Sequence, residues 1–214
     1  RVENTHLEED ELFDLRRSLA TIAGMVKILN HSDEDDGHGE PEDGWRREKK
    51  YPYPALHRLS QDVMTFPQLI QRIDQILDKF GKIRDNATPE LLQIRRELAK
   101  TEGSISRTLY SILRSAQSEG IVEKDVTPTL RDGRLVIPVI PTLKRRIKGI
   151  VHDESATGKT VFIEPTEVVE ANNRVRELEG EERKEIIRIL TSFTNKVRPY
   201  VREIMDSYRF LAII

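Results

Sequence analysis

The sequence contains no cysteine, and aromatic residues make up only 6% of its 214 residues. Without cysteine, the chain has no disulfide, no thiolate nucleophile and no cysteine-ligated zinc site. No apolar run approaches the roughly 18 residues that a membrane-spanning helix needs, and the first residues show no signal-peptide pattern. We therefore expect a cytoplasmic protein with no membrane partner.

Apolar residues are also scarce, at 37% of the chain, whereas charged residues make up 34%. This composition favours long, exposed helices over one compact globule, so we expect an elongated molecule. The formal net charge is only −2, but acidic residues gather at 33–43 and basic residues at 131–148. Local charge therefore says more about partners than net charge does. Because the chain begins with Arg1 rather than methionine, we interpret it as a segment of a longer protein.

Regularly spaced apolar residues predict long helices on both sides of the middle of the chain. A narrow seam over residues 12–29 is typical of a coiled coil or bundle, and a wider stripe over residues 66–83 predicts an amphipathic helix. The next helix is predicted to begin with Thr88 as its N-cap and Pro89 as its first residue, and to end before Gly120. It would contain about 30 residues and be about 45 Å long.

A returning long helix is predicted to begin at Thr166 and to be kinked or interrupted at Pro199. Two long helices joined by a compact insertion most simply run antiparallel. We therefore predict a mostly α fold, a long antiparallel helical bundle with a small β insertion at its tip. The expected domains are helices over residues 1–118, the β insertion over residues 119–165 and the returning helix over residues 166–214.

An acidic, glycine-containing stretch over residues 31–50 interrupts the first helical domain. It has too little apolar surface to offset the entropy of ordering it, so we predict a mobile loop. His31, His38 and the nearby carboxylates resemble a metal site only superficially. His38 stands where an EF-hand that begins at Asp33 needs glycine, so we expect no metal there.

Residues 131–165 are the only part where β-branched residues run consecutively in strand-length pieces between proline, glycine and aspartate. Asp132 and Gly133 predict a turn, and Pro138 and Pro141 indicate an edge strand. The expected strands lie near residues 135–140, 147–152 and 160–163, with a hairpin loop over residues 153–158.

This hairpin loop resembles the end of a phosphate-binding P-loop at residues 156–160. The P-loop motif needs a glycine where Asp153 stands, and strand residues follow Lys159 where the motif needs a helix. A nucleophilic relay of His152, Asp153 and Ser155 is also disfavoured, because successive strand residues point to opposite faces. We therefore expect neither nucleotide binding nor nucleophilic catalysis in this loop.

A magnesium site built from Asp153, Glu154 and Glu164 would lack a shaped cavity on a hairpin. The simpler interpretation is structural: Asp153 and Ser155 hydrogen-bond the turn backbone, and Gly158 adopts a positive φ. We assign this structural role to the motif His152, Asp153, Ser155, Gly158, Thr160 and Glu164.

Basic residues cluster in the first half of the β region, where Asp132 is the only acid. Such a patch predicts salt-sensitive binding of phosphates with little sequence preference, and a solvated surface is the alternative. No aromatic residue lies among them, so stacking on single-stranded bases is not indicated. The candidate nucleic-acid-binding residues are Arg131, Arg134, Lys144, Arg145, Arg146 and Lys148, with Lys159 near them across the hairpin.

Several motifs resemble the MutS-like paralogue family, the branch that lacks the mismatch-recognition domain. The resemblance is dense over about residues 66–190 and includes GKIRDNATPELLQIRR at residues 81–96. The sequence differs at Ile140, Thr157 and Lys159, where the family often has a basic residue, a serine and a small residue. The remaining motifs are Arg131-Asp132-Gly133-Arg134, Ile137-Pro138-Val139, Gly149-Ile150-Val151-His152-Asp153, Ser155, Gly158, Thr160, Phe162-Ile163-Glu164-Pro165 and Asn172-Asn173.

This resemblance implies a core or lever region with a clamp insertion, in a parent protein whose ATPase domain binds ATP and magnesium and which sometimes carries a nuclease domain. No GxxxxGK[ST] motif occurs in this chain, so we expect no catalytic residue, cofactor or metal here. Family members form homodimers and are associated with branched DNA and recombination control, and in some bacteria with collided ribosomes.

We therefore predict a nucleic-acid-binding arm that holds duplex or branched DNA by its phosphate backbone and relays ATPase-driven motion, in recombination control or DNA repair. Two alternatives stay open. The same arm could bind ribosomal RNA in a rescue factor for collided ribosomes, or the chain could be a purely structural coiled-coil dimerisation segment.

Overall fold

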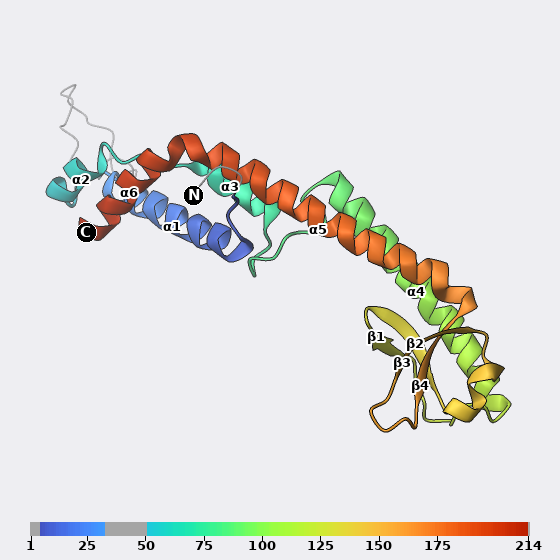
Figure 1. Ribbon diagram of the computed structural model, residues 1–214. Coiled ribbons are helices and arrows are strands. Elements are labelled where there is room, and N and C mark those ends of the chain that lie inside the picture. The colour runs from blue at the N-terminus through green and yellow to red at the C-terminus, as the bar shows by residue number, and fades with distance from the viewer. Residues whose placement is uncertain (1–4, 33–50, 214) are drawn as a thin grey trace, which may run out of the picture. The chain divides into compact units, whose positions relative to one another are not determined.

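A computed structural model describes residues 5–32 and 51–213 (Figure 1). The fold is mostly α-helical with one small antiparallel β-sheet, which confirms the predicted fold class. The chain divides into two compact units, unit 1 with residues 1–87 and 186–214 and unit 2 with residues 88–185. The predicted mobile loop lies almost entirely outside the described residues, and so does His38. Within the described helices, none is long and apolar enough to cross a membrane.

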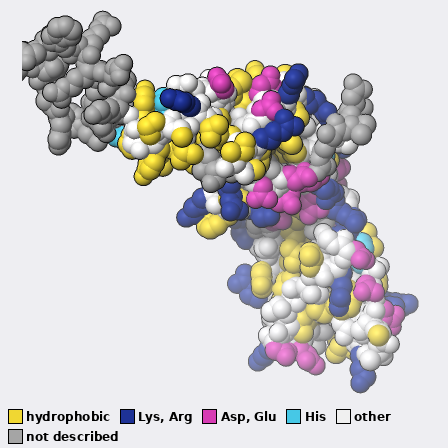
Figure 2. All heavy atoms as spheres, turned by 90° about the vertical axis from the view of Figure 1, so that its left-hand side faces the viewer, with side chains coloured by type: hydrophobic (Ala, Val, Ile, Leu, Met, Phe, Trp, Pro, Cys, Tyr) yellow, Lys and Arg dark blue, Asp and Glu magenta, His cyan; other side chains and the backbone are white. Residues whose placement is uncertain are grey.

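Unit 1 is a cluster of helices around α1 (Glu9–Leu29), which contacts α2 (Pro54–Ser60), α3 (Pro67–Ile76) and α6 (Val201–Ile213). The predicted seam supplies its core, since Leu12 and Leu19 are fully buried. Other apolar side chains remain on the surface of this unit, as the upper part of Figure 2 shows.

The stripe over residues 66–83 was predicted as one helix, and this prediction is wrong beyond Ile76. Asp78 accepts hydrogen bonds from the backbone N–H groups of Phe80 and Lys82, at 2.8 and 2.9 Å, and these bonds fold the chain into a turn. Gly81 completes the turn with a φ of 79°. Phe80, which has the spacing of a buried residue, is 73% exposed because the turn directs it outward.

Unit 2 begins with α4 (Pro89–Ser118), whose predicted start is confirmed: the Thr88 side chain accepts a hydrogen bond from the Leu91 N–H. The predicted end before Gly120 is also correct. The returning helix α5 (Val169–Val197) follows a short 3-10 turn, η2 (Thr166–Val168). As predicted at Pro199, α5 stops there, and η3 (Arg198–Tyr200) separates it from α6.

Contacts between α4 and the part of α5 in unit 2 show that the two helices run antiparallel. The hydroxyl of Thr88 donates to Glu185 at 2.7 Å, and Arg95 donates to Glu182 at 2.7 Å. Further along α4, Glu97 accepts from Arg174 at 2.9 Å. Residue numbers rise on one helix as they fall on the other, which confirms the predicted antiparallel pair.

The sheet has the strand order β1-β2-β4-β3, with β1 (Thr129–Arg131), β2 (Arg134–Val139), β3 (Gly149–Glu154) and β4 (Val161–Pro165). Asp132 and Gly133 both have positive φ, 48° and 73°, as a two-residue hairpin turn requires. The three predicted strands are present. The short β1 was not predicted, because Pro128 and the polar residues before it give no alternating pattern.

The predicted edge position of the strand with Pro138 is wrong, because β2 lies between β1 and β4. However, β1 pairs with β2 only as far as Val136. Pro138 pairs with Phe162 of β4 and lies past the end of β1. Its missing N–H therefore leaves no gap in a two-sided ladder.

The core of unit 2 lies between the second half of α4 and one face of the sheet. Leu109 of α4 and Ile137 of β2 are fully buried, and Ile163 of β4 is 1% exposed. Ile121 and Val122 close this core after the end of α4. The opposite face of β4 presents Phe162 and Glu164, which polar and charged side chains cover.

Candidate nucleic-acid interface

A short 3-10 helix between β2 and β3, η1 (Pro141–Arg146), carries three consecutive basic residues and has no buried residue. Pro141 suits its first turn, while Leu143 packs against the core and Ile147, just after it, is 8% exposed. These apolar residues hold the segment to the sheet. The positions between Leu143 and Ile147 carry Lys144, Arg145 and Arg146, and Lys148 follows Ile147; all four cations are exposed.

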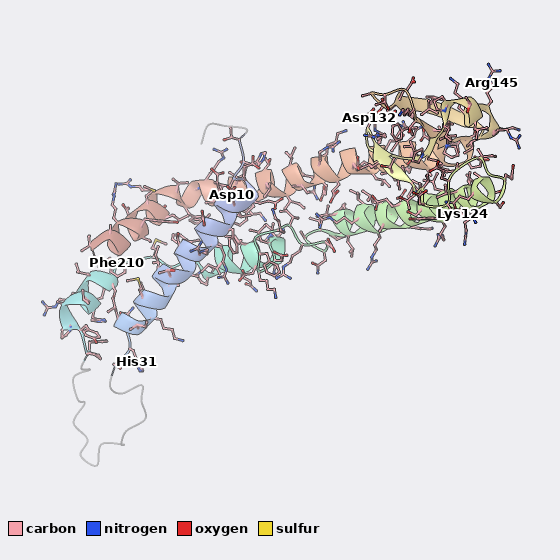
Figure 3. The ribbon with its side chains drawn as sticks, turned by 90° about the horizontal axis from the view of Figure 1, so that it is seen from below. Asp10, His31, Lys124, Asp132, Arg145 and Phe210 are labelled. Atoms are coloured by element: carbon pink, nitrogen blue, oxygen red, sulfur yellow. The ribbon has the colours of Figure 1, made fainter. Side chains whose placement is uncertain are left out.

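We name these four cations the η1 patch. Arg146 forms an exposed ion pair with Glu119 at the end of α4, at 3.5 Å. For Lys144, Arg145 and Lys148, no acidic partner is present among the described parts of the chain. Figure 3 shows Arg145 at the outer edge of unit 2 with its side chain directed away from the sheet. The patch can therefore approach an anion without breaking a buried contact.

The other predicted basic residues do not join the η1 patch. Figure 3 places Asp132, in the β1–β2 turn, and Arg145 on different sides of the body that holds the sheet. Arg131 lies over the Phe162 ring, with its guanidinium carbon 4.2 Å from the ring centre. Its Nε lies 3.9 Å from a carboxylate oxygen of Asp153. Lys159 is exposed in the hairpin loop. The window that looks continuous in sequence is therefore divided in space.

Arg134 is taken up by a buried network around Glu164, whose side chain is 0% exposed. Arg134 donates to Glu164 at 2.7 Å and to Asn173 at 2.6 Å, and Asn172 donates to Glu164 at 2.7 Å. His152 donates to the second carboxylate oxygen of Glu164. The guanidinium of Arg134 is therefore engaged by the buried network, whereas the cations of the η1 patch are exposed.

The network also sets the charge state of its central carboxyl group. Burial alone would raise the pKa of Glu164, since it removes water from the carboxylate. Hydrogen bonds from His152, Asn172 and Arg134, together with the positive charge of Arg134, outweigh burial and hold the pKa below its ordinary value. Glu164 is therefore ionised in the folded protein and acts as an anionic anchor for three neighbouring elements.

Glu164 can occupy this position because β3 and β4 approach very closely at one point. Gly149 of β3 pairs with Pro165, and a Cβ atom at Gly149 would lie 2.2 Å from the Glu164 carbonyl oxygen. Further along β3, the pairing register shifts between Val151 and Asp153, at His152. Close approach and register shift together bring the imidazole to the buried carboxylate.

The hairpin loop has the structural role that the sequence predicted. Asp153 accepts a hydrogen bond from the Glu154 N–H at 2.8 Å, and Ser155 accepts one from the Thr160 N–H at 3.0 Å. Gly158 has a φ of 65°. A strand, β4, follows this loop directly, so the backbone has no helix N-terminus to face a phosphate there.

The sequence alone did not predict the polar and acidic partners that contact Arg134 and Arg146. Asn172 and Asn173 stand out in the sequence only through the family resemblance, and nothing in their spacing shows that they contact β2 and β4. Glu119 also gave no signal, because it is separated from Arg146 by the whole β2–η1 segment.

The folded chain thus combines an antiparallel helix pair with a small sheet that carries a basic patch, and proteins of known name contain a similar segment. No protein-family model matches the chain. It is 40% identical over 201 residues to a protein named Endonuclease MutS2 from Levilactobacillus brevis, which covers 94% of this chain and 24% of that protein. Proteins of the same name from Lacticaseibacillus paracasei and Pelotomaculum thermopropionicum are 34% and 37% identical over 198 and 165 residues.

In these two cases the match covers 92% and 77% of this chain and 23% and 21% of the relatives. The chain therefore spans about a quarter of the length of the curated relatives it matches. It is related, over most of its length, to a segment of MutS2 proteins.

Proposed function

We propose that this chain is a DNA-binding part of a MutS2-related protein, and that the η1 patch holds the phosphate backbone of duplex or branched DNA. The observation that carries the proposal is the exposure of Lys144, Arg145, Arg146 and Lys148 on one short segment anchored by buried apolar residues. The similarity to proteins named Endonuclease MutS2 supports DNA as the partner.

The chemistry of the patch fits phosphate better than bases. Lysine and arginine neutralise phosphates and release counterions, so they provide affinity without reading sequence. The region from Arg131 to Lys148 contains no aromatic side chain for base stacking. Lys159, exposed in the hairpin loop, offers the same type of contact. DNA shape, such as a junction, would then decide preference.

The helix pair gives this patch a mechanical connection to the rest of a longer protein. We propose that α4 and α5 transmit ATP-driven motion from an ATPase domain elsewhere in the parent protein, which would also bind magnesium and form the homodimer. In this proposal the chain binds and transmits, and does not catalyse. Its support is that His152, Asp153 and Ser155 are all engaged in structural contacts.

Reversing two charges of the η1 patch tests the proposal. Arg145→Glu with Lys148→Glu should weaken binding to duplex and four-way-junction DNA by about tenfold to a hundredfold, because two charge-assisted phosphate contacts are lost. The slope of log affinity against log salt should decrease in magnitude by about 2. Fluorescence anisotropy over a salt series measures both quantities.

The matched control is Arg183→Glu with Lys184→Glu, which reverses two exposed charges on α5. These positions neighbour Glu182 and Glu185, which contact the start of α4, whereas η1 contacts its end. Equal weakening by both double variants would show that only net charge matters. If Arg145→Glu with Lys148→Glu leaves the DNA affinity unchanged but abolishes binding to ribosomal RNA, the ribosome-binding alternative is favoured. If the wild-type chain binds no nucleic acid at low salt, the coiled-coil alternative is favoured.

A further inference from the structure

The outer face of α4 carries a second basic surface, separate from the η1 patch. At about 100° per residue, the residues within about 40° of Lys100 form one line along the helix. All of these positions are exposed, and none is acidic. We name this line the α4 stripe; from residue 93 onward it consists of Gln93, Arg96, Lys100, Ser104, Arg107, Ser111, Arg114 and Ser118.

The four cations of the stripe differ from Arg95, the fifth basic residue of α4, in having no acidic partner among the described residues. Arg95, on the side that faces α5, pairs with Glu182 at 2.7 Å. Within the described ranges, no acid pairs with Arg96, Lys100 or Arg107, and Arg114 contacts only the Tyr110 carbonyl oxygen of its own helix, at 3.3 Å. The stripe therefore retains its full positive charge at the surface.

This arrangement is unfavourable for the helix by itself. Arg96 and Lys100 are four residues apart, where like charges repel. Ser104 and Ser111 are poorer helix formers than alanine, lysine or glutamate would be at exposed positions. Solvated helix surfaces usually mix both signs of charge. A row of unpaired cations with serine between them instead presents the donors that bind phosphate oxygens, namely ammonium, guanidinium and hydroxyl groups.

The geometry of the stripe matches an extended phosphate backbone. Arg96 and Arg114 are 18 positions apart on one straight helix, which corresponds to about 27 Å, or about eight base pairs of duplex. The first half of the stripe borders an open groove of about 820 Å³, which Ala171 lines on the α5 side. Glu97 also lines this groove, and its carboxylate accepts a hydrogen bond from Arg174. At the other end of α4, the Arg146–Glu119 contact joins η1 to the helix terminus. The segment η1 therefore lies next to the end of α4 at which the stripe finishes.

We propose that the α4 stripe is a second phosphate-binding surface, along which a duplex bound at the η1 patch continues. This inference rests on the proposed function for the identity of the ligand, but it assigns different residues. It changes the nature of the binding site from a single point of contact to a track along a helix. The track would align the duplex axis with the helix that is proposed to transmit motion.

Neutralising the stripe tests the inference in the 214-residue chain. The triple variant Lys100→Gln, Arg107→Gln and Arg114→Gln keeps good helix formers at exposed positions. On a duplex of about 24 base pairs, the slope of log affinity against log salt should decrease in magnitude by about 3, because three phosphate contacts are lost. The control Arg176→Gln, Arg183→Gln and Lys184→Gln removes the same charge from exposed positions of α5 and should change the slope much less.

A local measurement makes the test independent of net charge. Because the chain has no cysteine, Ser111→Cys introduces a single thiol on the stripe. Saturating duplex should slow its modification by a neutral thiol reagent several-fold, whereas Ser192→Cys on α5 should react at an unchanged rate. Equal rates at position 111 with and without duplex would overturn the inference.

The outcomes separate this inference from the proposed function. If Arg145→Glu with Lys148→Glu weakens binding and the stripe variant does not, the η1 patch stands and the stripe is refuted. If the stripe variant alone weakens binding, the stripe stands and the η1 assignment fails. If neither set of substitutions changes the affinity, both proposals fail.

Discussion

The buried carboxylate of Glu164 determines which cations of unit 2 remain available at the surface. It holds Arg134 at 2.7 Å, so this arginine is an internal residue although it lies in the most basic window of the sequence. It also holds His152 and Asn172, and so links three strands to the first turns of α5. An ionised buried group of this kind stabilises only while all its partners are present.

We predict that Glu164→Gln destabilises the chain by about 3 kcal/mol at neutral pH, because Arg134 then lies buried without an opposing charge. The folded-state pKa of Glu164 is below its ordinary value of 4.5. Its contribution is therefore present above about pH 4.5 and is lost as the pH falls through the lower folded-state value. Urea unfolding of the wild-type chain and of Glu164→Gln between pH 7 and pH 3 measures the difference in their unfolding free energies.

The difference in unfolding free energy between the two proteins should narrow below about pH 4.5. Glu170→Gln is the control, since this acid is exposed at the start of α5, and it should change stability by less than about 0.5 kcal/mol. A difference for Glu164→Gln that stays constant down to pH 3 would show that its charge is not the cause.

At the scale of the elements, the pairing of β3 with β4 depends on the close approach of Gly149 to the backbone of Glu164. These strands hold the hairpin loop, the imidazole of His152 and the carboxylate of Glu164 in register. The contact is possible only because Gly149 has no side chain. Helices of the same chain tolerate side chains at glycine positions, since a Cβ atom at Gly180 of α5 would meet nothing within 4 Å.

Two alanine substitutions should therefore have opposite effects. Gly149→Ala should destabilise the chain by about 3 kcal/mol or more, because its Cβ atom would overlap the backbone of Glu164. Gly180→Ala should stabilise it by about 0.5–1 kcal/mol through improved helix propensity. Thermal unfolding followed by circular dichroism measures both. Equal effects of the two substitutions would contradict the close approach of β3 and β4.

At the scale of the whole molecule, the chain contains two compact units. Leu109 is fully buried among α4 and the sheet in unit 2, and Ile73 is fully buried in unit 1. The helix α5 contributes residues to both units, since its residues 169–185 belong to unit 2 and its residues 186–197 to unit 1. Because compact units of a chain can open separately, we predict that the stability of each unit can be changed independently.

Native-state hydrogen exchange should reveal this independence. Leu109→Ala should cost about 2–5 kcal/mol and speed amide exchange in α4 and the sheet, while α1 and α3 retain their protection. Ile73→Ala should have the reverse effect. If either substitution speeds exchange by the same factor throughout the chain, the two units unfold as one cooperative body.

Local signals predicted the elements but not their contacts. Thr88 and Pro89 determine where α4 begins because capping involves neighbours in sequence. The predicted helix over residues 66–83 failed because Asp78 and Gly81 form a turn, and turn chemistry prevailed over apolar spacing at Phe80. The η1 patch could be predicted from composition. The separation of Arg134 from this patch could not be predicted from composition. It depends on which residues of a distant strand and helix face the Arg134 guanidinium.

The sequence by itself determined the long helices α4 and α5, the Thr88 cap, the Asp132-Gly133 hairpin, the backbone hydrogen bonds of the residues 153–158 loop and the presence of excess positive charge. These features depend on interactions within a few residues, so they can be read along the chain. Only the tertiary structure decided which positive charges are available. Glu164 and Asp153 lie far in sequence from Arg134 and Arg131 but engage them in space. In the described residues, no such partner faces Lys144, Arg145, Lys148 or the outer face of α4. Whether a cation is neutralised depends on a partner a few ångströms away, and folding alone brings that partner close.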